Sequence, residues 1–216
     1  IPNFHNTPVR YETFKKAVEK DICGRVATVK KEIEFVNAHA SDMSLLTDML
    51  KKGEIPLRVT HNDTKLNNCM FDKDTGATIC VIDLDTIMPG LRAYDYGDSI
   101  RFGATTGAED EPDLSKVNFS LELFKSYTEG FIKACGESMD EKEALSLPIG
   151  AKLMTLECGM RFLTDYLEGD TYFKISRENH NLDRCRTQFK LVSDMEKVWD
   201  KMNGIVLREF EKAKEK

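Results

Sequence analysis

The residues of this chain best suited to chemistry lie in the segment 61–68, with the sequence HNDTKLNN. Asp63 could accept the proton of a substrate hydroxyl group, and Asn68, on the same tight loop, could bind Mg²⁺ through its amide oxygen. Lys65 could neutralise the charge of a phosphoryl group during transfer, while His61 would support the loop. A polar loop with an Asx turn at Asp63 and a cap at Asn68 would need the same residues. The segment alone leaves both interpretations open.

A second acidic group favours the chemical interpretation. Asp83 and Asp85 directly follow a β-rich run, Ile79–Ile82. The order H-x-D-x-x-x-x-N, hairpin and aspartate is typical of a kinase catalytic loop and its metal-binding aspartate. Because Mg²⁺ prefers oxygen ligands and keeps several waters, we expect Asn68 and Asp83 to bind it together with ATP phosphates, and Asp85 to join directly or through water. A carboxylate that only caps a turn is the alternative for Asp83.

Strands and helices must position these side chains. The runs Leu57–Thr60, Cys69–Phe71 and Thr78–Ile82 favour strands, and the turn residues 72–76 predict a hairpin between the second and third runs. Apolar residues recur at helical spacing over residues 9–52, after Pro89, and over 143–167 and 182–210. We expect an extended segment over 1–8 and a helix N-cap near Ser41-Asp42. Residues 182–210 predict either one long helix or two helices with a break near Gly204. The sequence therefore predicts a mainly α protein with a small β-hairpin region, an α+β fold.

Length and composition fit a single domain. The chain has 216 residues, and we expect one domain over 1–216. A net charge of −6 disfavours nucleic acid as a partner, and the apolar runs are too short to span a membrane. Six cysteines without a C-x-x-C pair indicate free thiols in a reducing compartment, so we expect a cytoplasmic protein.

These motifs resemble a known superfamily. Residues 61–68, followed by Val81–Asp85, resemble the aminoglycoside phosphotransferase-like, protein-kinase-like superfamily. The segments 3–8, 61–71, 82–98 and 161–166 are similar to N-acetylhexosamine 1-kinases. The resemblance implies the C-terminal lobe of a kinase fold that uses ATP as co-substrate. It also implies Asp63 as general base, Asn68 and Asp83 as magnesium ligands, and phosphorylation of the anomeric 1-hydroxyl of N-acetylglucosamine or N-acetylgalactosamine.

The resemblance further implies three residues that contact the acetamido sugar, namely Phe102, Arg161 and Tyr172. Arg161 could donate two parallel hydrogen bonds, and the aromatic rings could pack on the C–H faces of a sugar. Phe102 as a core residue and Arg161 as a surface charge are the alternatives. Asp95 and Asp98 follow a turn at Pro89-Gly90, and we expect Asp95 or Asp98 to cap a helix or to brace the catalytic loop; direct contact with the substrate is the alternative.

One departure from the family concerns the nucleotide. A kinase of this type needs a phosphate loop, a strand lysine and an adenine-binding hinge in an N-terminal lobe, and nothing before Asp63 has such a pattern. We therefore expect the missing N-terminal lobe to be a partner of this chain and the isolated chain to be inactive. Two alternatives stay open: a choline, aminoglycoside or other small-molecule kinase of the superfamily, and a non-catalytic carbohydrate-binding lobe.

Overall fold

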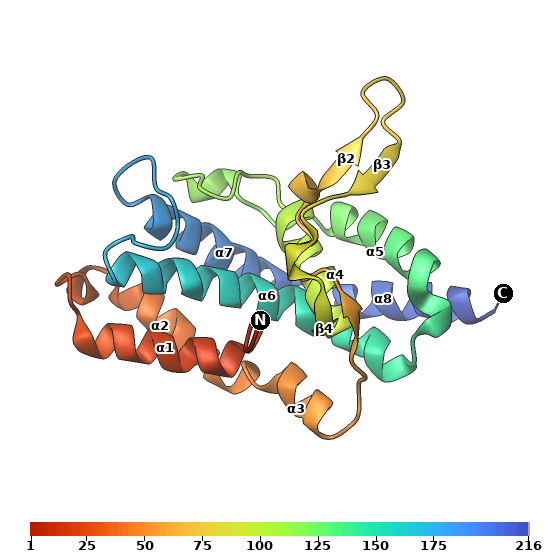
Figure 1. The fold of residues 1–216 in the computed structure, drawn as a ribbon, viewed down its shortest axis with the longest axis horizontal. Helices are drawn as coiled ribbons and strands as arrows, with labels where there is room; N and C mark the ends of the chain where they lie inside the picture. The colour runs from red at the N-terminus through yellow and green to blue at the C-terminus, as the bar shows by residue number, and fades with distance from the viewer. Residues whose placement is uncertain (216) are drawn as a thin grey trace.

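The computed structural model describes residues 1–215, and its centre is one long helix, α6 (Glu141–Leu167). Figure 1 shows α6 in the middle, with other helices above, below and beside it. Asp140 caps α6 by accepting a hydrogen bond from the backbone N–H of Glu143 at 2.8 Å, and the acidic residues Glu141 and Glu143 suit the positive end of the helix dipole. Most positions of α6 are buried, as expected for a helix covered on several sides.

The remaining helices pack directly or indirectly on α6. Their bounds are α1 (Thr7–Lys20), α2 (Lys30–Ala38), α3 (Leu45–Lys51), α4 (Arg92–Gly103), α5 (Leu121–Cys135), α7 (His180–Lys197) and α8 (Trp199–Lys214). One buried core joins α1, α4, α6 and α7, and a second joins α4, α5, α6 and α8. Helix α4 contributes to both cores, so its position is fixed from two sides.

The backbones of α4 and α6 touch at a pair of glycines. A Cβ atom on Gly97 would lie 2.3 Å from the backbone oxygen of Gly150, and a Cβ atom on Gly150 would lie 2.2 Å from the backbone oxygen of Ala93. Neither position has room for a side chain. This crossing sets the distance between α4 and the centre of the molecule.

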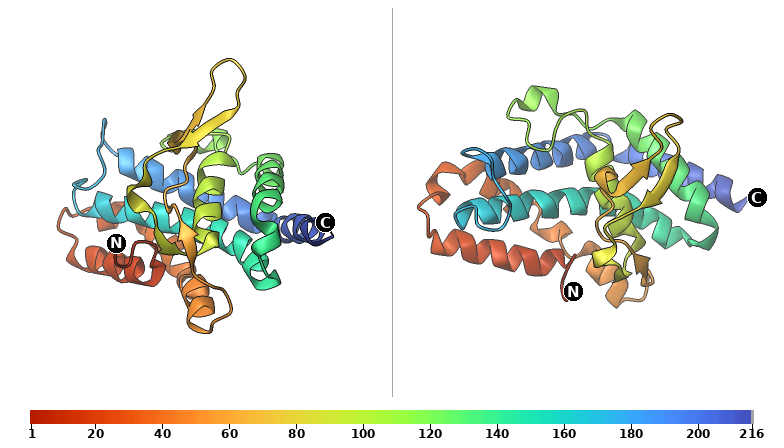
Figure 2. Two further views of the ribbon diagram at one scale, coloured as in Figure 1. Left: turned by 45° about the vertical axis from the view of Figure 1, so that its right-hand side comes forward. Right: turned by 45° about the horizontal axis from the view of Figure 1, so that its top comes forward.

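Two short antiparallel sheets lie beside this helical body. Strand β1 (Arg58–Thr60) pairs with β4 (Met88–Gly90), and β2 (Cys69–Phe71) pairs with β3 (Thr78–Val81). In the turn that joins β2 and β3, the Asp72 side chain accepts hydrogen bonds from the backbone N–H groups of Asp74 and Thr75. Figures 1 and 2 show that the β2–β3 hairpin projects away from the helices.

The structure confirms the predicted fold class and hairpin but corrects several boundaries. Helix α1 begins at Thr7, because Asn6 caps it and Pro8 fits a first helical turn, so the segment 1–8 is not extended throughout. Residues 40–42 form a 3-10 turn, and Ser44 precedes α3. The break between the last two helices falls at Val198, whereas Gly204 lies inside α8, where a helix tolerates glycine at a cost of about 1 kcal/mol.

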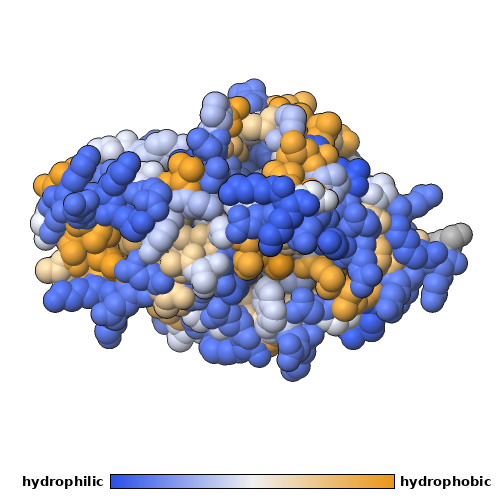
Figure 3. Space-filling view, turned by 90° about the horizontal axis from the view of Figure 1, so that it is seen from below, coloured by the Kyte–Doolittle hydropathy of each residue, from blue (hydrophilic) through white to orange (hydrophobic). Residues whose placement is uncertain are grey.

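The surface carries apolar side chains among many charged ones. On the face drawn in Figure 3, the apolar residues form separate patches between hydrophilic ones. Within residues 1–215, no helix has the length and apolar character needed to cross a membrane.

Candidate active site

The loop after β1 places three of the predicted functional side chains together. The Nζ of Lys65 lies 2.9 Å from Oδ2 of Asp63, and Nδ2 of Asn68 donates to the same oxygen at 2.9 Å. Nδ2 of Asn68 also donates to the backbone oxygen of Asp63 at 2.9 Å. Within residues 1–215, Oδ1 of Asp63 accepts no hydrogen bond. One carboxylate oxygen is therefore held by two donors, and the other is left for a ligand.

Asp95 and His61 hold this loop in place. The carboxylate of Asp95, on α4, accepts the backbone N–H groups of His61 at 2.9 Å and Asn62 at 2.7 Å. Burial raises the pKa of the Asp95 carboxyl group, although these two hydrogen bonds oppose the shift. His61 accepts the backbone N–H of Asp63 at Nδ1, so Nε2 is the nitrogen that donates to the oxygen of Ile82 at 3.0 Å. The loop is therefore positioned by Asp95 of α4 and by Ile82, which directly follows β3.

The predicted magnesium ligands lie at the base of the hairpin. The backbone N–H of Ile82 donates to the backbone oxygen of Asn68 at 2.9 Å. Asp83 is the next residue after Ile82, so it lies close to Asn68. Asp83 adopts a left-handed backbone conformation, with φ 61°, and Asp85 follows on the short turn 84–86. Within residues 1–215, the carboxylates of Asp83 and Asp85 and the amide oxygen of Asn68 take part in no hydrogen bond or ion pair.

The chemistry of these donors fits Mg²⁺. They are hard oxygen atoms that remain unpaired within the described part of the chain, and Mg²⁺ takes few protein ligands and completes its shell with phosphates and water. Among residues 1–215, no group of three or more His, Cys, Asp or Glu side chains is placed to hold a metal ion. Asn68, Asp83 and Asp85 thus suit a metal that arrives with a nucleotide.

A cavity of about 470 Å³ opens beside Asp63. Its volume is within the range of small-molecule sites. Its charged lining is nearly balanced, with four carboxylates and five cationic side chains. These are Asp63, Asp98, Glu109, Glu157, Lys65, Arg101, Arg161, Lys174 and Arg184. Four aromatic rings complete the wall, from Phe4, Phe162, Tyr172 and Phe173.

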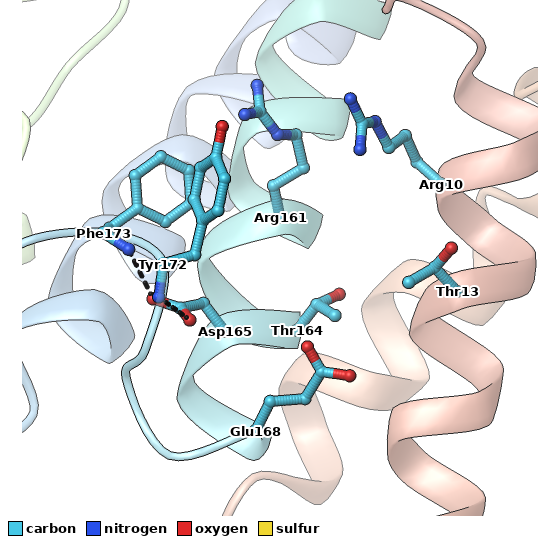
Figure 4. Close-up of a pocket in the computed structure, with 8 residues that line it drawn as sticks. All are labelled: Arg10, Thr13, Arg161, Thr164, Asp165, Glu168, Tyr172 and Phe173. Carbon is cyan, nitrogen blue, oxygen red and sulfur yellow. Dashed lines mark hydrogen bonds between the residues drawn. The ribbon is translucent and has the colours of Figure 1, made fainter. Parts of the chain in front are cut away.

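Arg161 and Tyr172 lie together on one wall of this cavity. The guanidinium carbon of Arg161, on α6, is 5.8 Å from the centre of the Tyr172 ring and 5.4 Å from that of Phe173. Figure 4 shows these side chains in the adjoining pocket, with Arg10 of α1 reaching toward Arg161. Within residues 1–215, Arg161 forms no hydrogen bond or ion pair, so its donors are available to a ligand.

Asp165 holds the loop that carries these rings. Its carboxylate accepts the backbone N–H groups of Tyr172 at 2.8 Å and Phe173 at 2.9 Å, as the dashed lines in Figure 4 show. It also accepts Nδ2 of Asn181 at 2.8 Å. The loop is thereby tied to α6 one turn from Arg161, which explains why Tyr172, eleven residues further along the chain, lies beside Arg161.

Asp98 and Phe102 occupy different positions on α4. Oδ1 of Asp98 accepts Nε of Arg101 at 2.9 Å, and Nη1 of Arg101 donates to Glu109 at 2.6 Å. Asp98 lines the cavity beside Asp63, whereas Phe102 lines a separate cavity of about 160 Å³. Arg101 and Glu109 line both cavities. The structure therefore brings Asp63, Asp98, Arg161 and Tyr172 to one cavity but does not bring Phe102 to it.

Comparison with protein families identifies the framework of this site. The family described as "Phosphotransferase enzyme family" matches residues 2–125, which is more than half of the chain. The chain belongs to the phosphotransferase enzyme family. Together with the mainly helical fold and its antiparallel hairpin, this membership establishes the C-terminal lobe of a kinase-like fold. The match includes the catalytic loop and the hairpin base, whereas Arg161 and Tyr172 lie beyond it.

Sequence reasoning missed three residues that organise this candidate site. His5 and Glu157 form a buried pair beside the loop 61–68, and Asp165 fixes the loop that carries Tyr172. An acidic residue at an otherwise apolar position of α6 was the available signal for Glu157, because a buried carboxylate requires partners.

Proposed function

We propose that this chain is the catalytic, acceptor-binding lobe of an ATP- and Mg²⁺-dependent kinase. Its acceptor would be the anomeric 1-hydroxyl of N-acetylglucosamine or N-acetylgalactosamine. The observation that carries the proposal is that Asp63, Arg161 and Tyr172 line the same cavity of about 470 Å³. A base, a fork of hydrogen-bond donors and an aromatic face are thus available to one small ligand.

The geometry around Asp63 supports its role as general base. Its Oδ2 is held by Lys65 and Asn68, each at 2.9 Å, so the orientation of the carboxylate is fixed before a substrate binds. Oδ1 would accept the proton of the acceptor hydroxyl as its oxygen attacks the γ-phosphorus of ATP, while the bond from that phosphorus to the β,γ-bridging oxygen breaks and ADP leaves. Lys65 would counter the negative charge of the phosphoryl group. Asn68 and Asp83, with Asp85 nearby, would hold Mg²⁺, which would neutralise the phosphate charge when bound.

The lining of the cavity favours a neutral polar acceptor over a polycation. Sites for ammonium ligands use clustered carboxylates or aromatic cages. Here the five lysine and arginine side chains slightly outnumber the four carboxylates, and Arg161 is unpaired within the described chain. A choline or an aminoglycoside would have to approach these cations. A sugar with an acetamido group would instead offer acceptors to Arg161 and C–H faces to Tyr172.

We propose that a nucleotide-binding lobe of the same polypeptide covers the strands beside the site. Apolar side chains are exposed along the strands and the loops that flank them, among them Val59 at 84%, Ile79 at 59% and Met70 at 47% exposure. Apolar side chains left exposed on neighbouring strands, such as Met70 on β2 and Ile79 on β3, commonly mark an interaction surface. The hairpin base with Asn68 and Asp83 lies in the same region, so a nucleotide bound between the lobes would reach the metal ligands.

A panel of acceptors tests the substrate proposal. The protein joined to its nucleotide-binding lobe would be assayed with ATP and N-acetylhexosamines, plain hexoses, choline, homoserine and an aminoglycoside. We expect the highest kcat/KM for an N-acetylhexosamine. A preference for choline or an aminoglycoside would refute the sugar acceptor and leave the phosphotransferase fold intact. Absence of transfer to every acceptor, despite sugar binding, would favour the non-catalytic carbohydrate-binding lobe.

A further inference from the structure

His5 lies where the start of the chain meets the catalytic loop. Its side chain is 10% exposed and lines the cavity beside Asp63. Nε2 of His5 is 3.0 Å from the backbone oxygen of Asn62, and Nδ1 is 3.3 Å from Oε1 of Glu157 on α6. Figure 1 shows the N-terminal end of the chain beside α6 and β4. One imidazole ring therefore links three segments that are far apart in the sequence.

The two partners of His5 determine how many protons the ring needs. A backbone oxygen and a carboxylate both accept hydrogen bonds, whereas a neutral imidazole has one N–H to donate. Glu157 is 1% exposed, and its other oxygen accepts the hydroxyl of Thr7 at 2.7 Å, which suits an ionised carboxylate. Both hydrogen bonds of His5 form only when the His5–Glu157 pair holds a second proton, as an imidazolium beside a carboxylate.

His180 provides an internal contrast. Its Nδ1 accepts the backbone N–H of Ser176 at 3.1 Å, and its Nε2 lies 2.9 Å from Asp110. A neutral imidazole with its proton on Nε2 satisfies both of these contacts. The requirement for an extra proton therefore arises from having two accepting partners, and it is not shared by every buried histidine of the chain.

The group held by His5 leads directly into Asp63. Asn62 has a left-handed backbone with φ 65°, an uncommon conformation for a residue with a side chain. Its N–H is held by Asp95, and its side chain is held by Thr60 and Thr86. Its carbonyl, which belongs to the peptide bond with Asp63, has His5 as its hydrogen-bond partner within residues 1–215. His5 thus completes the set of contacts that fix this peptide.

We propose that His5 is a positioning residue, whose imidazolium and the Glu157 carboxylate anchor the Asn62–Asp63 peptide to α1 and α6. The anchor keeps the Asp63 carboxylate directed into the cavity. The link to catalysis rests on the proposed role of Asp63 as general base, whereas the protonation of the pair does not depend on it.

The charged groups around His5 affect the pH at which its imidazole ring gains or loses a proton. The negative charges of Asp95 and Asp98 on α4 and of Glu157 on α6 interact with the ring. The centre of the Tyr94 ring lies 5.1 Å from the centre of the imidazole. Burial alone would lower the pKa of His5, but the hydrogen bond and charge of Glu157, the hydrogen bond to Asn62 and the charge of Asp98 together raise the pKa above its ordinary value. Because its pKa is raised in the folded protein, the charged form of His5 stabilises the fold. This stabilisation is complete below a pH of about 6.5, the ordinary pKa of histidine, and is lost as the pH rises through the raised pKa.

Nitrogen NMR of the imidazole rings tests the protonation directly. In ¹⁵N-labelled protein at pH 7, we expect both ring nitrogens of His5 to carry protons, and those of His180 to show one protonated and one bare nitrogen. In Glu157→Gln, the amide can donate to Nδ1, so His5 should be neutral at pH 7, and the stabilisation that its charged form gives the wild-type protein at lower pH should be lost. A neutral His5 at pH 7 in the wild-type protein would overturn the proposal.

His39 offers a matched control for the positioning role. It joins the backbone oxygen of Phe35 at 2.7 Å to Glu196 at 3.0 Å, which repeats the arrangement of His5 away from the catalytic loop. We expect His5→Leu and His39→Leu to lose similar stability. His5→Leu alone should lose about ten- to a hundredfold in kcat, the effect of one charged hydrogen bond, with an unchanged KM for ATP.

Amide hydrogen exchange separates this proposal from the proposed function. Exchange at residues 61–64 should be at least about tenfold faster in His5→Leu than in His39→Leu, whether or not the protein transfers phosphate. If His5→Leu does not fold, Glu157→Gln should show the faster exchange as the pH falls and His5 gains a charge without a counterion. Equal exchange and equal kcat in the two leucine variants would refute the positioning role. Loss of all transfer in the wild type would refute the proposed function alone.

Discussion

The substitution Gly150→Ala should damage both stability and activity, because it acts on the contact that sets the position of α4. The new Cβ atom would lie 2.2 Å from the oxygen of Ala93, which is 0.8 Å inside the 3.0 Å limit of real Cβ contacts. Neither the Cβ atom, which is fixed to the backbone of α6, nor the backbone oxygen of Ala93 can rotate away, so α4 must move. Overpacking of this kind costs about 1–3 kcal/mol, and we expect the upper end because backbone meets backbone.

The same movement would reach the catalytic loop. Asp95 is two residues from Ala93 on α4, and its carboxylate holds the N–H groups of His61 and Asn62 at 2.9 and 2.7 Å. A displacement approaching 1 Å would break or lengthen these hydrogen bonds. Misplacement of a catalytic group by about 1 Å can lower the rate about a hundredfold, and we expect a fall in kcat of that order.

Chemical denaturation and steady-state kinetics of the variant would test this reasoning. Gly130→Ala is the matched control, because Gly130 lies inside α5 with no atom within 4 Å of its new Cβ. That control should gain about 0.5–1 kcal/mol, the usual benefit of alanine over glycine in a helix. A Gly150→Ala protein as stable as the wild type, with kcat within a factor of about two, would show that the α4–α6 contact does not position the loop.

Three further substitutions test the proposed roles in the protein joined to the proposed nucleotide-binding lobe. Asp63→Asn should lower kcat by at least about a hundredfold and leave the KM of the acceptor nearly unchanged, because general base catalysis acts in the transition state; a kcat near that of the wild type would exclude Asp63 as the base. Asp83→Ala should remove the Mg²⁺ dependence of ATP binding measured by calorimetry, and retention of that dependence would place the metal elsewhere. Arg161→Ala should raise the KM of the sugar about ten- to a hundredfold more than that of ATP, whereas Arg208→Ala, an exposed change on α8, should alter neither value; equal effects on sugar and ATP would contradict the sugar contact.

The parts of the fold that could be predicted depend on contacts close in sequence. The turn residues 72–76 and the flanking β-rich runs predicted the β2–β3 hairpin, because a hairpin is closed by its own turn. Strand β4 was not predicted. Met88–Gly90 contains proline, which strand patterns disfavour, and its pairing with β1 spans almost thirty residues. The helix break at Gly204 was wrong because glycine weakens a helix without ending it.

The candidate site divides in the same way. Asp63, Lys65 and Asn68 meet because they share one loop, so their spacing alone indicated a common site. His5 and Glu157 are separated by 152 residues, and no local pattern could pair them. The position of Phe102 in a separate cavity follows from the rotation of α4, which is fixed by its two cores and its glycine contact with α6.

The identity of the phosphorylated product tests the central claim most directly. The protein joined to the proposed nucleotide-binding lobe would be incubated with ATP, Mg²⁺ and N-acetylglucosamine, in parallel with its Asp63→Asn variant, and the product examined by ³¹P–¹H correlation NMR. We predict a phosphorus signal coupled to the anomeric proton of the sugar in the wild type and a strongly reduced signal in the variant. A phosphate on another hydroxyl group would contradict the proposed orientation of the sugar, and equal product from both proteins would contradict the central role of Asp63.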